Sequence, residues 1–425
     1  MDTKISLVEK GCTDRVGALF VEAFNHNSAL LVADENTLSV AGFAVTRSLE
    51  QQNIVVRQCC FPAEPQVYAD EHSIEIVRNS LSMDNSIIVV LGSGSLNDIA
   101  KRASFELERP YMVVATAPSV DGYTSYGAAV SIQGFKQTLP CNAPYAVVAD
   151  TDILCSAPMP MIASGFGDCM AKFTAGADWI LADTLGIQPI RKDIWDMVQN
   201  PLHQVYARAE KIGSRDRAAI GTLFEALSAS GFAMQIMHDS RPASGSEHLI
   251  SHIWEMEHLC KDGLPVSHGF KVAVGTIAIS FLYDKLQSMD FSSILDNKME
   301  TWEERKDYIR NFFPSDNLFN QVLPLAKAKF LTGDELLERR KAILKSFKEI
   351  KTRCSEQLPG YEKLSLAMQT VSCPTMVSEI NANKEDLVRA IKGAQIIRNR
   401  YTILDLLYEV GLLDEALLAL EGLAI

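Results

Sequence analysis

Short apolar runs in the first 150 residues of the chain predict five strands. They are SALLVADE (28–35), NIVVRQCCF (53–61), SIIVVLGSGS (86–95), YMVVATAP (111–118) and YAVVADTDIL (145–154). Such uninterrupted apolar runs are typical of strands buried on both faces of a sheet. Segments compatible with helices lie between several of the strands, at 15–27, 37–51 and 70–83. The pattern therefore predicts a parallel α/β domain.

The pattern changes twice further along the chain. Residues 123–141 alternate polar and apolar positions with interspersed glycines, which predicts a hairpin or an extended excursion between two sheet strands. After about residue 156 strand-like runs become rare, and long helical patterns cover 159–185, 215–239, 244–258, 267–289, 333–357 and 384–421. We expect an α/β domain over 1–156 and an all-α domain over 157–425, with APMPM (157–161) as the hinge.

Composition narrows the class of protein. The net charge of −13 argues against an electrostatic grip on nucleic acid or on an anionic membrane. The N-terminal residues lack the pattern of a signal peptide, and no apolar run reaches the ~18 residues of a spanning helix. Nine cysteines without CxxC spacing predict reduced thiols. We expect a cytoplasmic protein that acts on a small molecule.

A glycine-rich turn follows the third predicted strand. Gly92, Ser93, Gly94 and Ser95 lead into a helix that should begin near Leu96. Small residues before a helix N-terminus allow a pyrophosphate to approach the backbone N–H groups. The full GxGxxG spacing is missing, because Asp98 stands near the third glycine position, so an ordinary βα turn is the alternative.

Two further positions could contact a cofactor. In TAPSVDGYTS (116–125), Thr116, Ser119 and Ser125 could hydrogen-bond a phosphate or a nicotinamide amide, and Asp121 could accept from a substrate hydroxyl. The alternative is a simple turn built on the proline, aspartate and glycine of that loop. Asp34, after the first predicted strand, could accept from a cofactor hydroxyl or cap the next helix.

The helical half carries a possible metal site. Five of the eight histidines fall between 238 and 268, and His248 and His252 share one helix face. Asp168, His248 and His268 would offer a carboxylate and two imidazoles, a set that suits Zn²⁺, Ni²⁺, Fe²⁺ or Mn²⁺. In this stretch Glu247 precedes the first histidine, unlike the HExxH motif, so a metalloprotease is disfavoured. Structural or exposed histidines are the alternative.

Five segments together resemble one family. GSGSLNDIAK, TAPSVDGYTS, GFGDCMAKFTAGADW, SGSEHLISHIWEME and SHGFKVAVGT resemble, in order and approximate spacing, segments of the glycerol-1-phosphate dehydrogenases. That family belongs to the superfamily of glycerol dehydrogenase, iron-containing alcohol dehydrogenases and 3-dehydroquinate synthase. The resemblance covers roughly residues 1–300. The remainder, 300–425, is more similar to the bacterial members and carries no recognisable chemical motif.

The resemblance implies a dehydroquinate synthase-like fold, with a Rossmann-like nucleotide-binding α/β domain, a helical metal-binding domain and the site in the cleft between them. It implies that Asp168, His248 and His268 bind the metal, and that His252 contacts the substrate instead of acting as a fourth ligand. Asp121 and His252 would be the catalytic residues, with Asp168 also close to the substrate. The implied cofactor contacts are Asp34, Gly92, Ser93, Gly94, Ser95, Asp98, Thr116, Ser119 and Ser125.

The implied activity is the NAD- or NADP-linked interconversion of dihydroxyacetone phosphate and sn-glycerol 1-phosphate, with one divalent metal (zinc, nickel or iron), by a homodimer. A dehydrogenase for glycerol or another polyol is the nearest alternative, because no basic cluster marks a phosphate pocket unambiguously, and Lys136 and Lys271 are candidates for one. A 3-dehydroquinate synthase-like lyase is disfavoured, because its carboxylate ligand is normally Glu where this chain has Asp168. A non-enzymatic nucleotide-binding protein is disfavoured by the presence of all three ligands. Glu247 and Glu255 are expected on the helix surface or behind the ligands.

Overall fold

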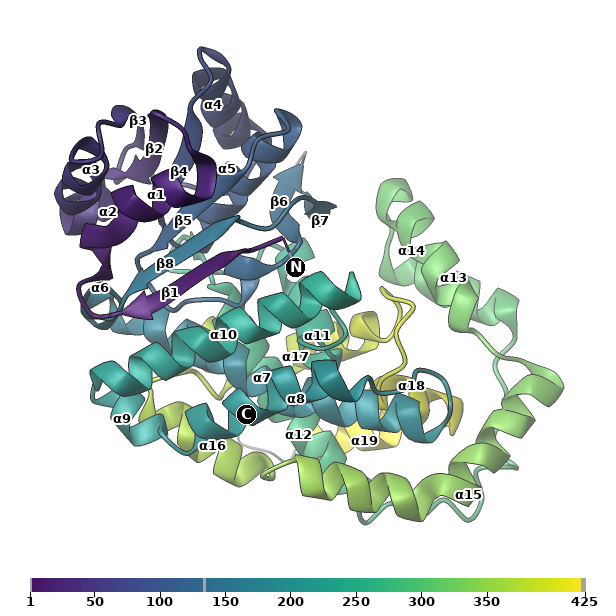
Figure 1. Ribbon diagram of the computed structural model, residues 1–425. Helices are drawn as coiled ribbons and strands as arrows, with labels where there is room; N and C mark the ends of the chain where they lie inside the picture. The colour runs from purple at the N-terminus through teal and green to yellow at the C-terminus, as the bar shows by residue number, and fades with distance from the viewer. Residues whose placement is uncertain (1, 133–134, 422–425) are drawn as a thin grey trace. The chain divides into compact units, whose positions relative to one another are not determined.

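The computed structural model describes residues 2–132 and 135–421, and its first unit is built on a six-stranded sheet (Figure 1). The strands run in the order β1-β8-β5-β4-β2-β3, and every pair is parallel. Their bounds are β1 Ile5–Glu9, β2 Ser28–Asp34, β3 Val55–Phe61, β4 Ile87–Gly92, β5 Tyr111–Ala115 and β8 Ala146–Asp150. The predicted parallel α/β fold is confirmed.

Helices cover the sheet because its four central strands are apolar on both faces. Side chains of α1 (Val16–Phe24) and α3 (Phe43–Glu50) form one core with alternate residues of the strands, such as Leu31 and Val89. The neighbouring strand residues point the other way and are also fully buried. Helices α4 (Glu71–Ser82) and α5 (Gly94–Glu106) pack against each other and contact the sheet.

The predicted strands appear as β2, β3, β4, β5 and β8, whereas β1 was not predicted. The fifth run was predicted to extend to residue 154, but β8 ends at Asp150 and α6 (Thr151–Ser156) begins there. The Asp150 carboxylate explains this end, because it accepts from the backbone N–H of Asp152 at 3.0 Å and caps the helix. Residues 123–141 contain the antiparallel pair β6 (Gly127–Ile132) and β7 (Phe135–Pro140), so the hairpin is confirmed.

Two further predicted boundaries differ from the structure. The helix predicted over 37–51 begins as α2 (Glu35–Thr37), passes through one π turn at Leu38–Gly42 and continues as α3. The helix predicted to start near Leu96 starts at Gly94.

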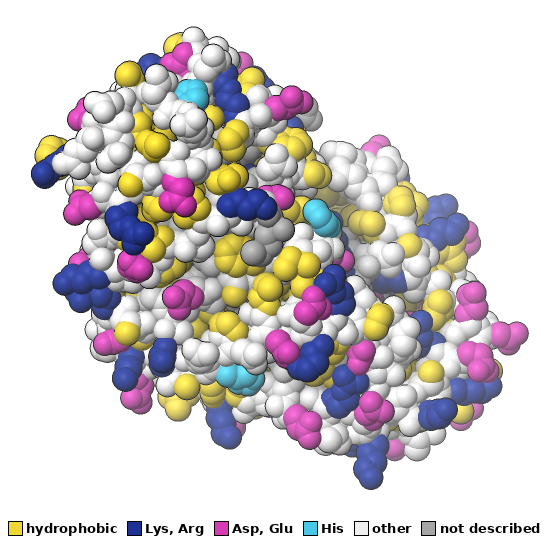
Figure 2. All heavy atoms as spheres, in the orientation of Figure 1, with side chains coloured by type: hydrophobic (Ala, Val, Ile, Leu, Met, Phe, Trp, Pro, Cys, Tyr) yellow, Lys and Arg dark blue, Asp and Glu magenta, His cyan; other side chains and the backbone are white. Residues whose placement is uncertain are grey.

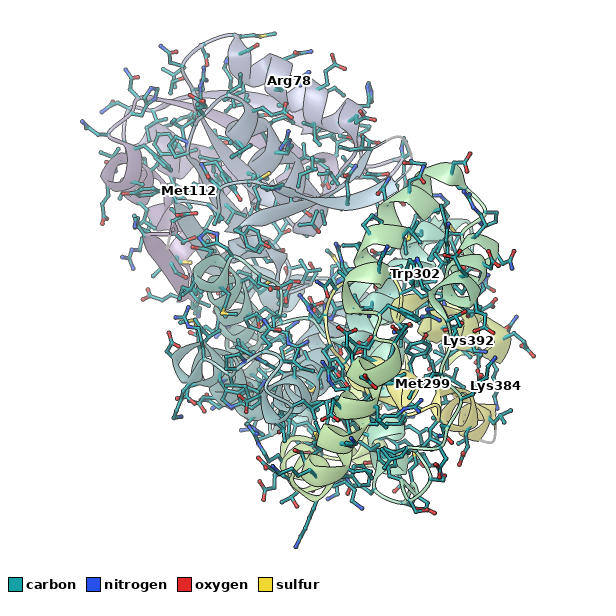
Figure 3. All side chains as sticks on the ribbon, turned by 90° about the vertical axis from the view of Figure 1, so that its right-hand side faces the viewer. Arg78, Met112, Met299, Trp302, Lys384 and Lys392 are labelled. Carbon is teal, nitrogen blue, oxygen red and sulfur yellow. The ribbon has the colours of Figure 1, made fainter. Side chains whose placement is uncertain are left out.

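From α7 onward the chain is helical, apart from the short pair β9 (Cys260–Lys261) and β10 (Leu264–Pro265). The helices up to residue 286 are α7 Met159–Thr184, α8 Lys192–Tyr206, α9 Ala209–Gly213, α10 Arg217–Met237, α11 Ser246–Met256 and α12 His268–Leu286. The rest are α13 Trp302–Phe312, α14 Asp316–Lys329, α15 Gly333–Gln357, α16 Tyr361–Thr370, α17 Lys384–Ala394, α18 Ile403–Glu409 and α19 Leu413–Glu421. A single helix over 384–421 was predicted, and this is wrong, since three helices fill that range. Figure 3 shows Trp302 on α13, and Lys384 and Lys392 on α17.

The chain forms two compact units, each built from three segments. The first contains Met1–Cys169, Asp196–Ser240 and Thr370–Ser372, and the second contains Met170–Trp195, Arg241–Gln369 and Cys373–Ile425. The division falls inside helix α7. The functional boundary predicted at residue 156 stays a prediction.

The surface and the thiols agree with the composition. Figure 2 shows basic and acidic side chains interspersed over the visible face, with no basic band. Among the described residues, no helix is both long and apolar enough to cross a membrane. All nine cysteines are free thiols.

Candidate active site

Three helices bring together the donor atoms of a possible metal centre. Asp168 lies on α7, His248 on the first turns of α11 and His268 at the first position of α12. Each offers one ligand atom, and these atoms lie within 4.8 Å of one another. The imidazole rings of His248 and His268 are 5.4 Å apart between centroids. Two imidazoles and one carboxylate at such spacing fit a divalent transition metal that keeps open positions.

Each imidazole is oriented by a carboxylate of α11. His248 Nδ1 lies 2.7 Å from Glu247 Oε1, and His268 Nδ1 lies 2.9 Å from Glu255 Oε1. A carboxylate on one ring nitrogen fixes the tautomer, so that Nε2 of each ring carries the lone pair a metal needs. The side chain of Glu247 is fully buried and that of Glu255 is 6% exposed, so neither lies on the helix surface. Of the two positions expected for these glutamates, the structure shows the one behind the histidines.

The N-terminus of α11 is anchored by Asp178, a fully buried residue of α7. Its Oδ2 accepts from the backbone N–H of Ser246 at 2.7 Å, and its Oδ1 accepts from Tyr283 Oη at 2.7 Å. Burial, helped by the nearby charge of Glu247, raises the pKa of Asp178 to about 6. Burial alone would raise the pKa of Glu247 too, but the hydrogen bond and charge of His248 outweigh it and hold that pKa below its ordinary value. The carboxylate of Asp178 thus fixes the N-terminus of α11.

Asp168 is held from the loop after β5. The backbone N–H of Asp121 donates to Asp168 Oδ2 at 2.9 Å. This approach requires Gly165, because a Cβ there would lie 1.7 Å from the carbonyl oxygen of Pro118. A glycine on α7 therefore lets the loop that carries Asp121 reach the metal-facing aspartate.

Lys101 on α5 organises the same loop. Its side chain is completely buried, and Nζ donates to the carbonyl oxygens of Gly122, Ser125 and Gly127 at 2.9, 3.0 and 2.9 Å. Burial lowers the pKa of Lys101. Sequence reasoning missed this residue, because nothing in the spacing of GSGSLNDIAK signals an ammonium that binds carbonyls some twenty residues away.

The predicted cofactor residues lie at the carboxyl ends of β2, β4 and β5, where ligands bind in open α/β sheets. Gly92 ends β4, and Gly94 opens α5, where a Cβ would meet Val120 at 3.1 Å. Asp34 Oδ1 accepts from the backbone N–H of Thr37 at 2.7 Å, so it caps α2, one of the two roles considered for it. Ser125 Oγ donates to backbone carbonyls of its own loop. Ser93, Ser95 and Asp98 are partly exposed, whereas Thr116 and Ser119 are buried.

His252 lies one turn after His248 and is half-buried. Burial lowers its pKa well below 6.5, Glu255 opposes that shift, and the positive charge of Arg398 adds to it. Of the two predicted phosphate candidates, Lys271 Nζ lies 3.3 Å from Glu255 Oε1. Lys136 lies on β7, and its side chain is outside the described part of the chain.

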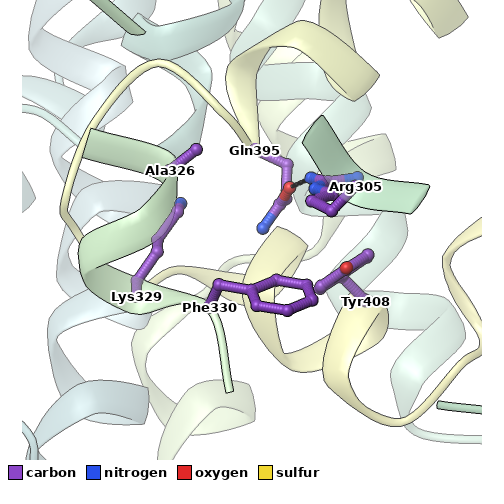
Figure 4. A pocket seen from close by; sticks show the side chains of 6 residues that line it. All are labelled: Arg305, Ala326, Lys329, Phe330, Gln395 and Tyr408. Carbon is purple, nitrogen blue, oxygen red and sulfur yellow. Dashed lines mark hydrogen bonds between the residues drawn. The ribbon is translucent and has the colours of Figure 1, made fainter. Parts of the chain in front are cut away.

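A small pocket occurs among the C-terminal helices (Figure 4). Its lining consists of Arg305, Ala326, Lys329, Phe330, Gln395 and Tyr408. Its cations are already paired, Lys329 with Asp405 at 2.6 Å and Arg305 with Glu300 at 3.8 Å. The space suits about one water molecule and no organic substrate.

Comparisons with known proteins agree with the fold. A probable glycerol dehydrogenase from Sinorhizobium meliloti 1021 has a similar structure, with a TM-score of 0.63 at 17% identity over 99% of this chain and 97% of that one. The sequence model of the iron-containing alcohol dehydrogenases matches residues 7–158. The fold is thus that of the metal-dependent alcohol and polyol dehydrogenases, the dehydroquinate synthase-like fold.

Closer relatives define the family. The chain is 32% identical over 401 residues to glycerol-1-phosphate dehydrogenase (NAD(P)+) from Geobacillus thermodenitrificans strain NG80-2, covering 93% of this chain and 90% of that protein. The enzyme of the same name from Methanosarcina barkeri is 31% identical over 283 residues, or 65% of this chain and 76% of that protein. This chain belongs to the glycerol-1-phosphate dehydrogenase family of oxidoreductases.

Proposed function

We propose that this chain interconverts dihydroxyacetone phosphate and sn-glycerol 1-phosphate with a nicotinamide cofactor and one divalent metal. The observation that carries the proposal is the grouping of Asp168, His248 and His268, with both imidazoles oriented by carboxylates, in a chain of this family. The same residues match the metal ligands that the family resemblance implies.

The chemistry divides between the cofactor, the metal and the chain. In the reducing direction a hydride from the reduced nicotinamide forms the new C–H bond at C2 of the ketone, its oxygen takes a proton, and NAD(P)+ leaves. A bound divalent metal supplies Lewis acidity, which polarises the carbonyl or acidifies the alcohol. The residues of the chain hold the donor atoms rigid, so little reorganisation is needed when the substrate arrives.

His252 and Asp121 are the residues we place at the substrate. His252 is neutral at pH 7, because its pKa lies well below 6.5, so it can accept the hydroxyl proton when the alcohol is oxidised. Asp121 is fixed by the bond from its backbone N–H to Asp168, and its carboxylate would accept from a substrate hydroxyl. The cofactor would lie over Gly92–Ser95 and the loop Thr116–Ser125, with Asp34 toward the adenosine end.

The test is an assay of purified, metal-analysed protein with NADH and NADPH. We expect oxidation of the cofactor with dihydroxyacetone phosphate, loss of activity after chelation, and recovery on adding zinc, nickel or iron. Activity with dihydroxyacetone alone would replace the proposed substrate by a free polyol. The metal, the choice of cofactor and the homodimer stay predictions that the same preparation can decide.

A matched pair of variants tests the ligand set. His268→Asn should lose the bound metal and the activity together, because one of three donors is removed. His258→Asn is the control, since His258 is exposed beyond the end of α11 and its left-handed backbone suits Asn. Metal content by mass spectrometry is the direct readout. A fully metallated His268→Asn would show that His268 is no ligand.

A further inference from the structure

The segment that joins α17 to α18, residues 395–402, is tied at both ends. Gln395 Nε2 donates to Asp405 Oδ1 at 2.9 Å, and Arg305 donates to Gln395 Oε1, as Figure 4 shows. At the other end the backbone N–H of Thr402 donates to Asp405 Oδ2 at 2.9 Å. Asp405 thereby holds both ends of the segment, which limits where the residues between them can lie.

Helix α17 and this segment run antiparallel to α11. Arg389 pairs with Glu257 at 2.6 Å, near the end of α11, and a Cβ on Gly393 would lie 2.7 Å from Ile253. Further along, Arg400 donates to the carbonyl oxygen of Ser244 at 2.5 Å. Contacts thus move toward the start of α11 as the tail advances.

The register places Arg398 level with the histidines along α11. It lies between Gly393, which contacts Ile253, and Arg400, which contacts Ser244, and His248 and His252 occupy that interval. Consistent with this, the charge of Arg398 acts on the His252 imidazole, whose facing charges also include Glu255, His248 and His268. Arg398 is exposed, so an incoming substrate can reach it.

The surroundings of the donor group are acidic. Asp168, Glu247 and Glu255 lie at or directly behind the possible ligands, and the whole chain carries a net charge of −13. The ammonium of Lys271 is also close, but it is buried and paired with Glu255 at 3.3 Å. A substrate with a phosphate group therefore needs a nearby cation. A guanidinium meets a phosphate through two parallel N–H donors, a geometry that an ammonium cannot provide.

We infer that Arg398 binds the phosphate of the substrate and so selects phosphorylated over free three-carbon substrates. This inference rests on the proposed function. It gives the C-terminal region, in which the sequence shows no chemical motif, a residue at the active site.

The experiment compares Arg398→Gln with Arg389→Gln in the metal-loaded protein. Arg389 is an exposed arginine of the same tail, paired with Glu257 and away from the histidines. We expect Arg398→Gln to raise the KM for dihydroxyacetone phosphate roughly 10- to 100-fold, the worth of a hydrogen bond to a charged group, and Arg398→Lys to recover part of that loss. The KM for NADH should stay unchanged, because we place the cofactor phosphates at Gly92–Ser95. Arg389→Gln should match the wild type.

Calorimetric titration with inorganic phosphate supplies a readout that does not need turnover. We expect Arg398→Gln to weaken phosphate binding by a similar factor. If the wild type reduces dihydroxyacetone phosphate while Arg398→Gln keeps both its KM and its phosphate affinity, the inference is wrong and the proposed function stands. If the wild type does not use dihydroxyacetone phosphate, the proposed function fails, and unchanged phosphate affinity in Arg398→Gln would overturn the inference as well.

Discussion

At the scale of single residues, Glu255 illustrates how the chain prepares a ligand. Its carboxylate orients His268 and lies 3.3 Å from Lys271 Nζ, so it connects two helices behind the donor atoms. The family resemblance predicted the grouping of Asp168, His248 and His268. The resemblance could not place Glu255, because its hydrogen bond with His268 joins two helices and depends on how α11 and α12 pack.

Replacing the Glu255 carboxylate should lower the affinity for the metal more than it lowers the stability of the fold. We expect Glu255→Gln to lower zinc affinity about 10- to 100-fold, because a neutral amide holds the tautomer and orientation of His268 less firmly than the carboxylate does. Competition with a chromogenic chelator measures the dissociation constant. Glu257→Gln, an exposed change two residues away, should leave the affinity of the wild type. Equal affinities in both variants would contradict an orienting role.

Lys101 and Arg398 show what residue patterns cannot reveal. Each acts through carbonyls or charges that folding brings close, Lys101 on the loop after β5 and Arg398 on His252. For neither residue does the spacing of a sequence motif predict which groups it contacts. Such residues become visible only when the register of neighbouring elements is known.

At the scale of elements, the sequence pattern predicted most of the sheet but not the separate helices within residues 384–421. The four central strands β2, β4, β5 and β8 are buried on both faces and leave long apolar runs, which is why they could be predicted. Both edge strands are partly exposed; the seven-residue β3 was still predicted, whereas the five-residue β1, with the sequence ISLVE, was missed. In the tail, apolar periodicity continues through the turns, so three helices resembled one.

A capping box marks the start of α18 and so separates it from α17. Thr402 precedes α18, its hydroxyl accepts from the backbone N–H of Leu404 at 3.2 Å, and with Asp405 it forms a capping box. We expect Thr402→Ala to lower the free energy of unfolding by about 1–2 kcal/mol. Urea denaturation followed by circular dichroism measures the change.

The comparison for that variant is Ser315→Ala. Ser315 precedes α14 and is exposed, and its side chain makes no capping hydrogen bond. Its replacement should change stability by only a few tenths of a kcal/mol. A loss as large as that of Thr402→Ala would mean that capping is not what distinguishes the two sites.

At the scale of the whole molecule, a buried acid in α18 makes stability depend on pH. Burial raises the pKa of Glu409 to about 7, against the opposing charge of Arg339 at 3.2 Å and the hydrogen bond from Tyr401. The folded state therefore binds a proton more tightly than the unfolded state does. The resulting stability is complete below the ordinary pKa near 4.5 and is lost as the pH rises to 7.

We expect the wild type to lose about 3 kcal/mol of unfolding free energy from this group between pH 4.5 and 7. Glu409→Gln should flatten that part of the profile, because the amide does not titrate and can still accept from Tyr401. Denaturation at several pH values between 5 and 8 provides the measurement. Glu356→Gln, an exposed change on α15, should keep the slope of the wild type, and an unaltered slope in Glu409→Gln would rule out this source.

The anchor at Asp178 has a consequence for the making of the protein. Its Oδ1 accepts from the backbone N–H of Ile403 at 2.9 Å, a residue 225 positions later in the chain. All strands of the six-stranded sheet have been synthesised by Asp150, so the sheet can form while the ribosome is still at work. At about 5–20 residues per second, Asp178 waits roughly 10–45 seconds for its last partner. Synthesis must therefore pass Ile403 before the helices behind the histidines can complete their packing.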